Sequence, residues 1–234
     1  MDAKMIAENV AHIRETMAQA ARDAGRAPED IQLCAATKMN DADAVRAAIA
    51  AGVDCCGENR VQELQQKLPQ GAYAGKPLHF IGRLQTNKVK YLVGTVDLIE
   101  SVDRMELLET IDKLAQKRGV VQRILLEVNI AGQESKAGFT ADEAAQLAAK
   151  MGDYPGVKLC GLMAIPPVSE HPGDNRIFFR QMRQLFVDIK GKTYDNVAME
   201  CLSMGMSDDY PDAIAEGSTM IRVGTAIFGA RHYI

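Results

Sequence analysis

The chain has 234 residues, of which 47% are hydrophobic and 25% are charged, a composition typical of an ordinary globular protein with a substantial core. Its formal net charge is −4. This mildly acidic balance, without a run of basic residues, argues against a surface that binds nucleic acid or an anionic membrane.

Predicted helices and strands alternate along the sequence. A helix comes first, because Met5, Val10, Ile13 and Met17 fall on one helical stripe that Gly25 can end. Eight short apolar runs then predict strands, at residues 31–37, 53–56, 78–82, 96–100, 122–130, 157–165, 200–204 and 220–226. Helices are predicted between them, at residues 41–51, 58–68, 85–93, 103–118, 140–151, 175–189 and 211–216.

This alternation predicts an α/β fold, a (β/α)8 TIM barrel with an extra N-terminal helix. Since no linker rich in proline or glycine divides the chain, we predict one domain over residues 1–234. An open doubly wound sheet is the alternative. It is disfavoured because no G-x-G-x-x-G motif follows the first strand.

Two further features concern compartment and metals. The N-terminal residues lack the apolar segment of a signal peptide, and no stretch is long and apolar enough to span a bilayer, so we expect a cytoplasmic protein. The five cysteines are odd in number and form no C-x-x-C pair, and the four histidines are scattered. The sequence therefore predicts buried reduced thiols, without a disulfide framework or a metal site.

Lys38 lies at the end of the first predicted strand, where active residues of such barrels are found. Burial disfavours the charged form of a lysine and makes its amine a better nucleophile toward a carbonyl. The alternatives are a lysine that extends to the surface or one that pairs with a carboxylate such as Glu58. From position alone, these alternatives are favoured.

The ends of the last two strands are suited to hold a phosphate. Ser203 and Ser207 offer hydroxyls in the loop after strand seven, with Met204 and a glycine between them. At the end of strand eight, Gly224 and Thr225 can donate backbone N–H groups to an anion. A lysine beside such a cradle suggests pyridoxal 5'-phosphate (PLP).

Three further residues have two interpretations each. Arg222 could direct a permanent cation at a heteroaromatic nitrogen, or form a buried salt bridge with Glu200 or Glu127. Asn59 could hydrogen-bond a ring substituent, but capping of the next helix by Asn59 or Glu58 is slightly favoured. Lys136 could receive a cofactor in transit, but a solvated loop lysine is favoured.

The sequence resembles the family of pyridoxal phosphate homeostasis proteins from about Asn9 to the C-terminus. Several uninterrupted motifs in the same order carry the resemblance. They are Ala36-Thr-Lys38, Gly57-Glu-Asn59, His79-Phe-Ile-Gly-Arg-Leu-Gln-Thr-Asn-Lys88, Val128-Asn129, Ser135-Lys-Ala-Gly138, Gly161-Leu-Met163, Leu202-Ser-Met-Gly-Met-Ser207, Gly217-Ser-Thr219 and the segment 222–231. Met39 and Leu78 depart from residues common in the family, and neither position belongs to the predicted lysine or cradle.

The resemblance implies a barrel like the N-terminal domain of alanine racemase, with PLP bound as a Schiff base to Lys38. The phosphate would contact Ser203 or Ser207, near Met204, and the backbone of Gly224 and Thr225. Arg222 would face the pyridine nitrogen, and Asn59 is assigned to the same site.

We expect a non-catalytic PLP-binding protein that stores and delivers the cofactor, with apo PLP-dependent enzymes as candidate recipients. A racemase needs a second acid or base opposite the lysine, and the racemases take it from a separate β domain that this sequence does not contain. The alternatives are a minor amino-acid racemase and a Schiff-base lyase without cofactor. We also expect a monomer, because the sequence shows no coiled-coil pattern.

Overall fold

The computed structural model describes residues 2–133, 136–168 and 171–229. Three of the motif positions, Ser135 and residues 230 and 231, lie outside this range. None of the helices in the described ranges combines the length and the hydrophobicity needed to cross a bilayer.

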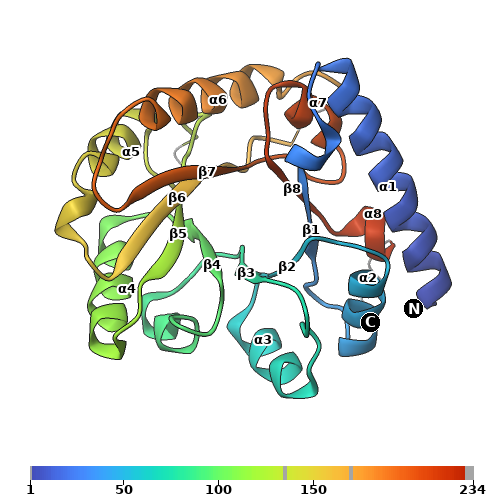
Figure 1. Ribbon diagram of the computed structural model, residues 1–234, viewed down its shortest axis with the longest axis horizontal. Helices are drawn as coiled ribbons and strands as arrows, with labels where there is room; N and C mark the ends of the chain where they lie inside the picture. Colours follow the sequence, from blue (N-terminus) through green and yellow to red (C-terminus); the bar gives the residue numbers. More distant parts are fainter. Residues whose placement is uncertain (1, 134–135, 169–170, 230–234) are drawn as a thin grey trace.

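Eight parallel strands form a closed barrel, in which each strand pairs with the next along the chain and β8 pairs with β1 (Figure 1). The pairing of Leu33 with Ile221 closes the ring and excludes the open doubly wound sheet. The predicted barrel is therefore confirmed. The strands are β1 Gln32–Ala36, β2 Cys55–Glu58, β3 Leu78–Phe80, β4 Leu98–Val102, β5 Gln122–Glu127, β6 Val157–Met163, β7 Val197–Ser203 and β8 Met220–Val223.

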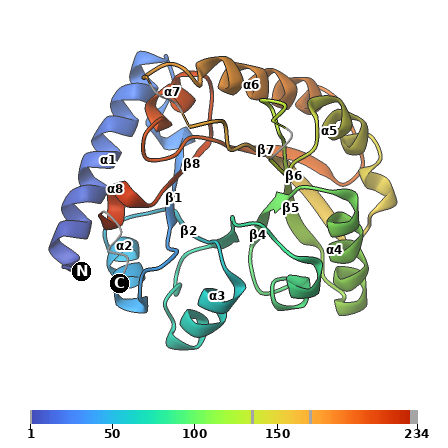
Figure 2. The same cartoon turned by 180° about the vertical axis from the view of Figure 1, so that it is seen from behind.

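Helices surround the barrel on its outer side, as both views show (Figures 1 and 2). The α-helices are α1 Ala3–Asp23, α2 Ala42–Ala50, α3 Val61–Lys67, α4 Met105–Arg118, α5 Ala141–Ala148, α6 Arg176–Lys190, α7 Tyr210–Ala215 and α8 Thr225–Phe228. Short 3-10 helices lie at η1 Pro28–Asp30, η2 Leu68–Gln70, η3 Thr86–Tyr91 and η4 Met151–Asp153.

The additional helix α1 covers the place where the barrel closes. Val10, Ile13 and Met17 of the predicted stripe are buried, in one cluster with residues of β1, β8, α2 and α8. The prediction of Met5 is wrong, because Met5 is 38% exposed and its neighbour Ile6 is buried in the same cluster. Burial of each such side chain contributes about 1.5–3 kcal/mol. The helix therefore fixes the pair of strands whose ends carry Lys38 and Gly224.

Two predicted boundaries differ in ways that affect the site. Glu58, predicted to begin a helix, is the last residue of β2, and α3 begins only at Val61. The last strand ends at Val223 rather than at residue 226, and Thr225 begins α8. Strand β2 ends later than the hydrophobic pattern indicates, because the Glu58 carboxylate is buried. Strand β8 ends earlier than the pattern indicates, because the chain turns at Gly224.

The barrel interior is rich in thiols. Strand alternation directs Cys34, Cys55, Cys160 and Cys201 inward, where they pack with leucine and methionine, while Cys56 faces the helical layer. All five cysteines are buried and free. The prediction of buried reduced thiols is confirmed.

Candidate functional site

Lys38 and the end of β8 lie at the same rim of the barrel. Lys38 is half-buried and follows Thr37, which is fully buried at the end of β1. A Cβ atom placed on Gly224 would lie 3.3 Å from the backbone oxygen of Ala36. The absence of a side chain at Gly224 therefore lets the two strand ends approach closely.

A buried ion pair supports the turn that carries Lys38. Lys67 Nζ donates to Glu58 Oε1 at 2.6 Å and to the backbone oxygen of Thr37 at 2.8 Å. The same Glu58 oxygen accepts from Thr37 Oγ1 and from Tyr73 Oη, while Glu58 Oε2 has no hydrogen-bond partner. Glu58 is thus the partner of Lys67. The expectation that it caps the next helix is wrong, because α3 has no side-chain cap.

Asn59 presents an acceptor without a partner. Its Oδ1 is one of three buried side-chain polar atoms in the described residues that have no hydrogen-bond partner. The first turn of α3 shows no side-chain cap, so the favoured interpretation of Asn59 as a helix cap is wrong. A buried acceptor left unpaired is costly, and a ligand that donates a hydrogen bond would remove that cost.

The loop after β7 and the start of α8 meet at the predicted phosphate cradle. Ser207 is half-buried, and its Oγ lies 3.4 Å from the backbone nitrogen of Ala226 in the first turn of α8. Gly224 is the N-cap of that helix and Thr225 its first residue. The Ser207 hydroxyl, which accepts from the Ala226 N–H, therefore lies next to the backbone that begins α8.

Two residues predicted for this cradle face elsewhere. Met204 is fully buried in the layer between barrel and helices, and its backbone N–H and C=O pair with Met220 and Ser218. Ser203 is also fully buried, and its hydroxyl is engaged inside the barrel. Both lie on β7 or directly after it, where backbone pairing with β8 and packing leave no group for a phosphate.

Arg222 is the centre of a buried polar network. Its guanidinium donates to Ser203 Oγ at 2.6 Å and to the backbone oxygen of Ala164 at 2.9 Å. Ser203 Oγ in turn donates to Glu100 Oε2 at 2.6 Å, and Glu100 Oε1 lies 2.7 Å from His79 Nδ1. The predicted salt-bridge partner Glu200 instead pairs with Arg123.

The charges of this network stabilise one another. Burial alone would raise the pKa of Glu100, but the hydrogen bond and charge of His79, together with the charge of Arg222, lower it. Burial likewise opposes protonation of His79, and the hydrogen bond and charge of Glu100 outweigh it and raise its pKa. Arg222 is therefore held as a fixed cation 4% exposed at the barrel interior.

A second acidic side chain besides Glu100, that of Glu127, lies at the rim of the barrel that carries Lys38. Burial and the neighbouring charge of Asp103 raise the pKa of Glu127 to about 7, against the opposing charges of Arg222, Arg83 and Lys136. Glu127 and Lys136 line a cavity of about 210 Å³. Lys136 is a partly exposed loop lysine, and its amine donates to the backbone oxygens of Ile165 and Pro166.

His79 opens one of the motifs that carry the family resemblance, but Glu100 and Lys67 were not predicted as parts of the site. Each was a polar residue within or beside a predicted apolar element. That position was the available signal, because buried charged residues are rare unless they are paired.

Comparisons with known proteins identify the family. The family model of the N-terminal domain of alanine racemase matches residues 2–232. The chain is 42% identical over 226 residues to a pyridoxal phosphate homeostasis protein of Aquifex aeolicus, covering 97% of this chain and 98% of that protein.

Solved structures agree with this. The structure of PipY of Synechococcus elongatus PCC7942 with PLP bound matches with a TM-score of 0.81 at 33% identity, over 96% of this chain and 100% of that one. Alanine racemase of Streptomyces lavendulae shares the fold, with a TM-score of 0.71 at 17% identity, but only 58% of its length is covered, against 99% of this chain. The chain therefore belongs to the family of pyridoxal phosphate homeostasis proteins, and it has the fold of the alanine racemase N-terminal domain.

Proposed function

We propose that this protein binds PLP covalently through Lys38 and holds it for delivery in intracellular PLP homeostasis. The observation that carries the proposal is the half-buried Lys38 at the rim where the Ser207 hydroxyl lies beside Gly224 and Thr225 at the start of α8. The family name and the PLP bound by PipY support it.

The residues at the rim fit each part of this cofactor. A lysine amine such as that of Lys38 forms a Schiff base with an aldehyde carbon, and the donor groups of Ser207, Gly224 and Thr225 suit a phosphate. Asn59 Oδ1, buried and unpaired, suits a hydroxyl donor on the ring. When bound, PLP supplies an electrophilic carbon and a ring that withdraws electrons most strongly when its nitrogen is protonated.

The polar network around Arg222 favours storage of PLP over catalysis with it. We propose that the ring nitrogen lies toward Arg222, whose guanidinium cannot give up its proton. A fixed cation at that position keeps the nitrogen unprotonated and so weakens the electron withdrawal that racemases and lyases need. Ser203 and Glu100 hold the guanidinium in place.

The test is reconstitution followed by dialysis, with visible absorbance as the readout. Wild-type protein and Lys136→Ala should keep a yellow chromophore through dialysis, and Lys38→Ala should lose it. A Lys38→Ala variant that retains the chromophore as wild type does would contradict the proposal. A colourless wild-type protein would instead favour a lyase without cofactor.

Delivery and catalysis are separated by two incubations of the PLP-loaded protein. We expect an apo PLP-dependent enzyme to gain activity when mixed with it, faster than from the same amount of protein reduced with borohydride. We expect single-enantiomer amino acids to keep their configuration. Racemisation that Lys38→Ala abolishes would show that the protein is an enzyme.

A further inference from the structure

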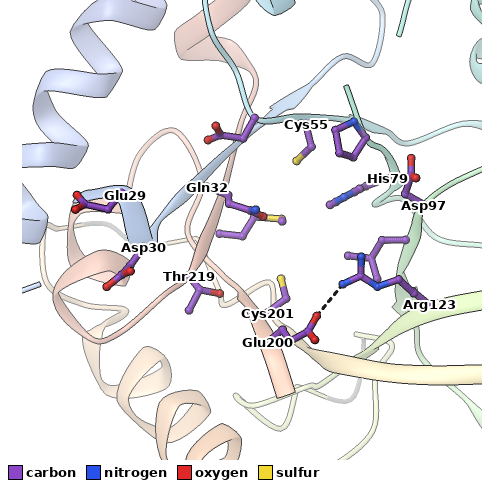
Figure 3. A pocket seen from close by; sticks show the side chains of 14 residues that line it. Glu29, Asp30, Gln32, Cys55, His79, Asp97, Arg123, Glu200, Cys201 and Thr219 are labelled. Atoms are coloured by element: carbon purple, nitrogen blue, oxygen red, sulfur yellow. Dashed lines mark hydrogen bonds and ion pairs between the residues drawn. The ribbon is translucent and has the colours of Figure 1, made fainter. Parts of the chain in front are cut away.

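A second cavity lies at the opposite end of the barrel from Lys38. It has a volume of about 300 Å³ and is lined by residues at the amino ends of the strands, from Gln32 on β1 to Met220 on β8. Figure 3 shows Cys55 and His79 on one wall of this cavity and Arg123 joined to Glu200 on another. Of the residues that line it, His79 also belongs, through Glu100, to the network that holds Arg222.

Three metal-binding side chains cluster beside this cavity, and two of them, Cys55 and His79, line it. Cys34 and Cys55 are paired neighbours on β1 and β2, and His79 lies on the adjacent strand β3. One ligand atom from each of the three lies within 4.8 Å of the others. In a tetrahedral zinc site, bond lengths place sulfur and nitrogen ligands ~3.5–3.8 Å apart, so small side-chain rotations suffice.

The surroundings orient these ligands. The Nδ1 of His79 is occupied by Glu100 at 2.7 Å, which leaves Nε2 as the nitrogen for a metal, as in carboxylate–histidine–zinc arrangements. A Cβ atom on Gly57 would lie 2.9 Å from Cys34 Sγ, so the glycine makes room for that thiol. The two thiols and the imidazole are thus placed before any ion binds.

The mouth of the cavity favours cations. Glu29, Asp30 and Asp97 line it, together with Asp54, whose charge is paired with Arg14 at 2.7 Å. The charge of Arg123 is paired with Glu200 at 2.9 Å. A concave surface lined mainly by one sign of charge raises the local concentration of the opposite ion. The cavity also gives a water molecule access as a fourth ligand.

We propose that Cys34, Cys55 and His79 bind Zn²⁺, or a similar thiophilic cation, at the amino end of the barrel, with water from the cavity as the fourth ligand. Binding forms two metal–sulfur bonds and one metal–nitrogen bond. The two thiol protons leave to solvent, together with the Nε2 proton when the imidazole is charged.

The test is titration of the reduced, chelator-treated protein with Co²⁺, measured as difference spectra. Tetrahedral thiolate coordination gives a sulfur-to-cobalt charge-transfer band and strong d–d bands, which Zn²⁺ should abolish by displacement. Cys34→Ala, Cys55→Ala and His79→Gln should each weaken Co²⁺ binding at least tenfold. Cys56→Ala is the matched control, since Cys56 is the next residue on β2 but faces the helices.

Far-UV circular dichroism checks that every variant is folded, so that a lost band reports a lost metal ligand and not an unfolded protein. Loss of the charge-transfer band in Cys55→Ala, with the band kept in Cys56→Ala, supports the site. A wild-type spectrum without a thiolate band means that Co²⁺ binds only to the acidic rim and overturns the proposal. A band that persists in both Cys34→Ala and Cys55→Ala also overturns it.

Discussion

Replacement of Lys67 by methionine should destabilise the protein strongly, because it leaves the charge of Glu58 buried. The Lys67 and Glu58 side chains are 8% and 0% exposed and 2.6 Å apart. Methionine keeps most of the length of lysine but removes its charge and its donors. Removal of one partner from a buried pair costs about 3–5 kcal/mol, and the lost bond to the Thr37 oxygen adds about 1 kcal/mol.

The second substitution of a double-mutant cycle isolates the charge effect. Glu58→Gln in the Lys67→Met background removes the unpaired carboxylate, so the double variant should regain about 2 kcal/mol relative to Lys67→Met. The surface pair Lys113–Glu109, with side chains 77% and 49% exposed, provides the control. Lys113→Met should change stability by less than about 0.5 kcal/mol.

The assay is urea unfolding followed by circular dichroism, with free energies extrapolated to water. The reasoning is refuted if Lys67→Met costs less than about 1 kcal/mol, or if the double variant is no more stable than Lys67→Met. Because Lys67 also binds the backbone of Thr37, beside Lys38, Lys67→Met should release bound PLP faster than Lys113→Met does.

Two further predictions concern the rim. The pKa of Glu127, raised from 4.5 to about 7, means that the folded state holds an extra proton between these values, so stability falls as pH rises through that window. Glu127→Gln removes this pH dependence. Between about pH 5 and about pH 8, the free energy of unfolding of the variant should fall by about 2 kcal/mol less than that of wild type, after allowance for the partial exposure of Glu127. Equal falls in the two proteins would contradict the prediction. Gly82→Ala would place a Cβ atom 2.1 Å from the backbone oxygen of Asn59, so it should weaken PLP retention in dialysis at least tenfold. Gly191→Ala, whose Cβ would meet nothing closer than 3.5 Å, should not; equal retention in the two variants would count against a role of Asn59.

The barrel was predictable because its signal is local and repeated. Each strand is a short apolar run, and each helix has its own stripe or end signal, as Ile6 to Met17 of α1 illustrate. Strand ends were less predictable. Glu58 looks like the start of a polar helix in sequence, and only the distant Lys67 and Tyr73 make it a buried strand residue.

The side-chain network was not predictable from spacing along the chain. His79, Glu100, Ser203 and Arg222 come from four strands, and barrel closure brings them together. The same holds for the cysteine and histidine cluster, since Cys34 and Cys55 are neighbours through strand pairing. Whether residues 1–234 form one domain, and whether the protein is a monomer, stay predictions.

The central claim is that Lys38 holds the cofactor, and one measurement tests it most directly. The PLP-loaded protein is reduced with borohydride, digested, and mapped by mass spectrometry for the added pyridoxyl phosphate group. The account predicts the modification on the peptide that contains Lys38, with unmodified Lys136 and Lys67 peptides. A modification found on Lys136, or spread over several surface lysines with Lys38 unmodified, would contradict it.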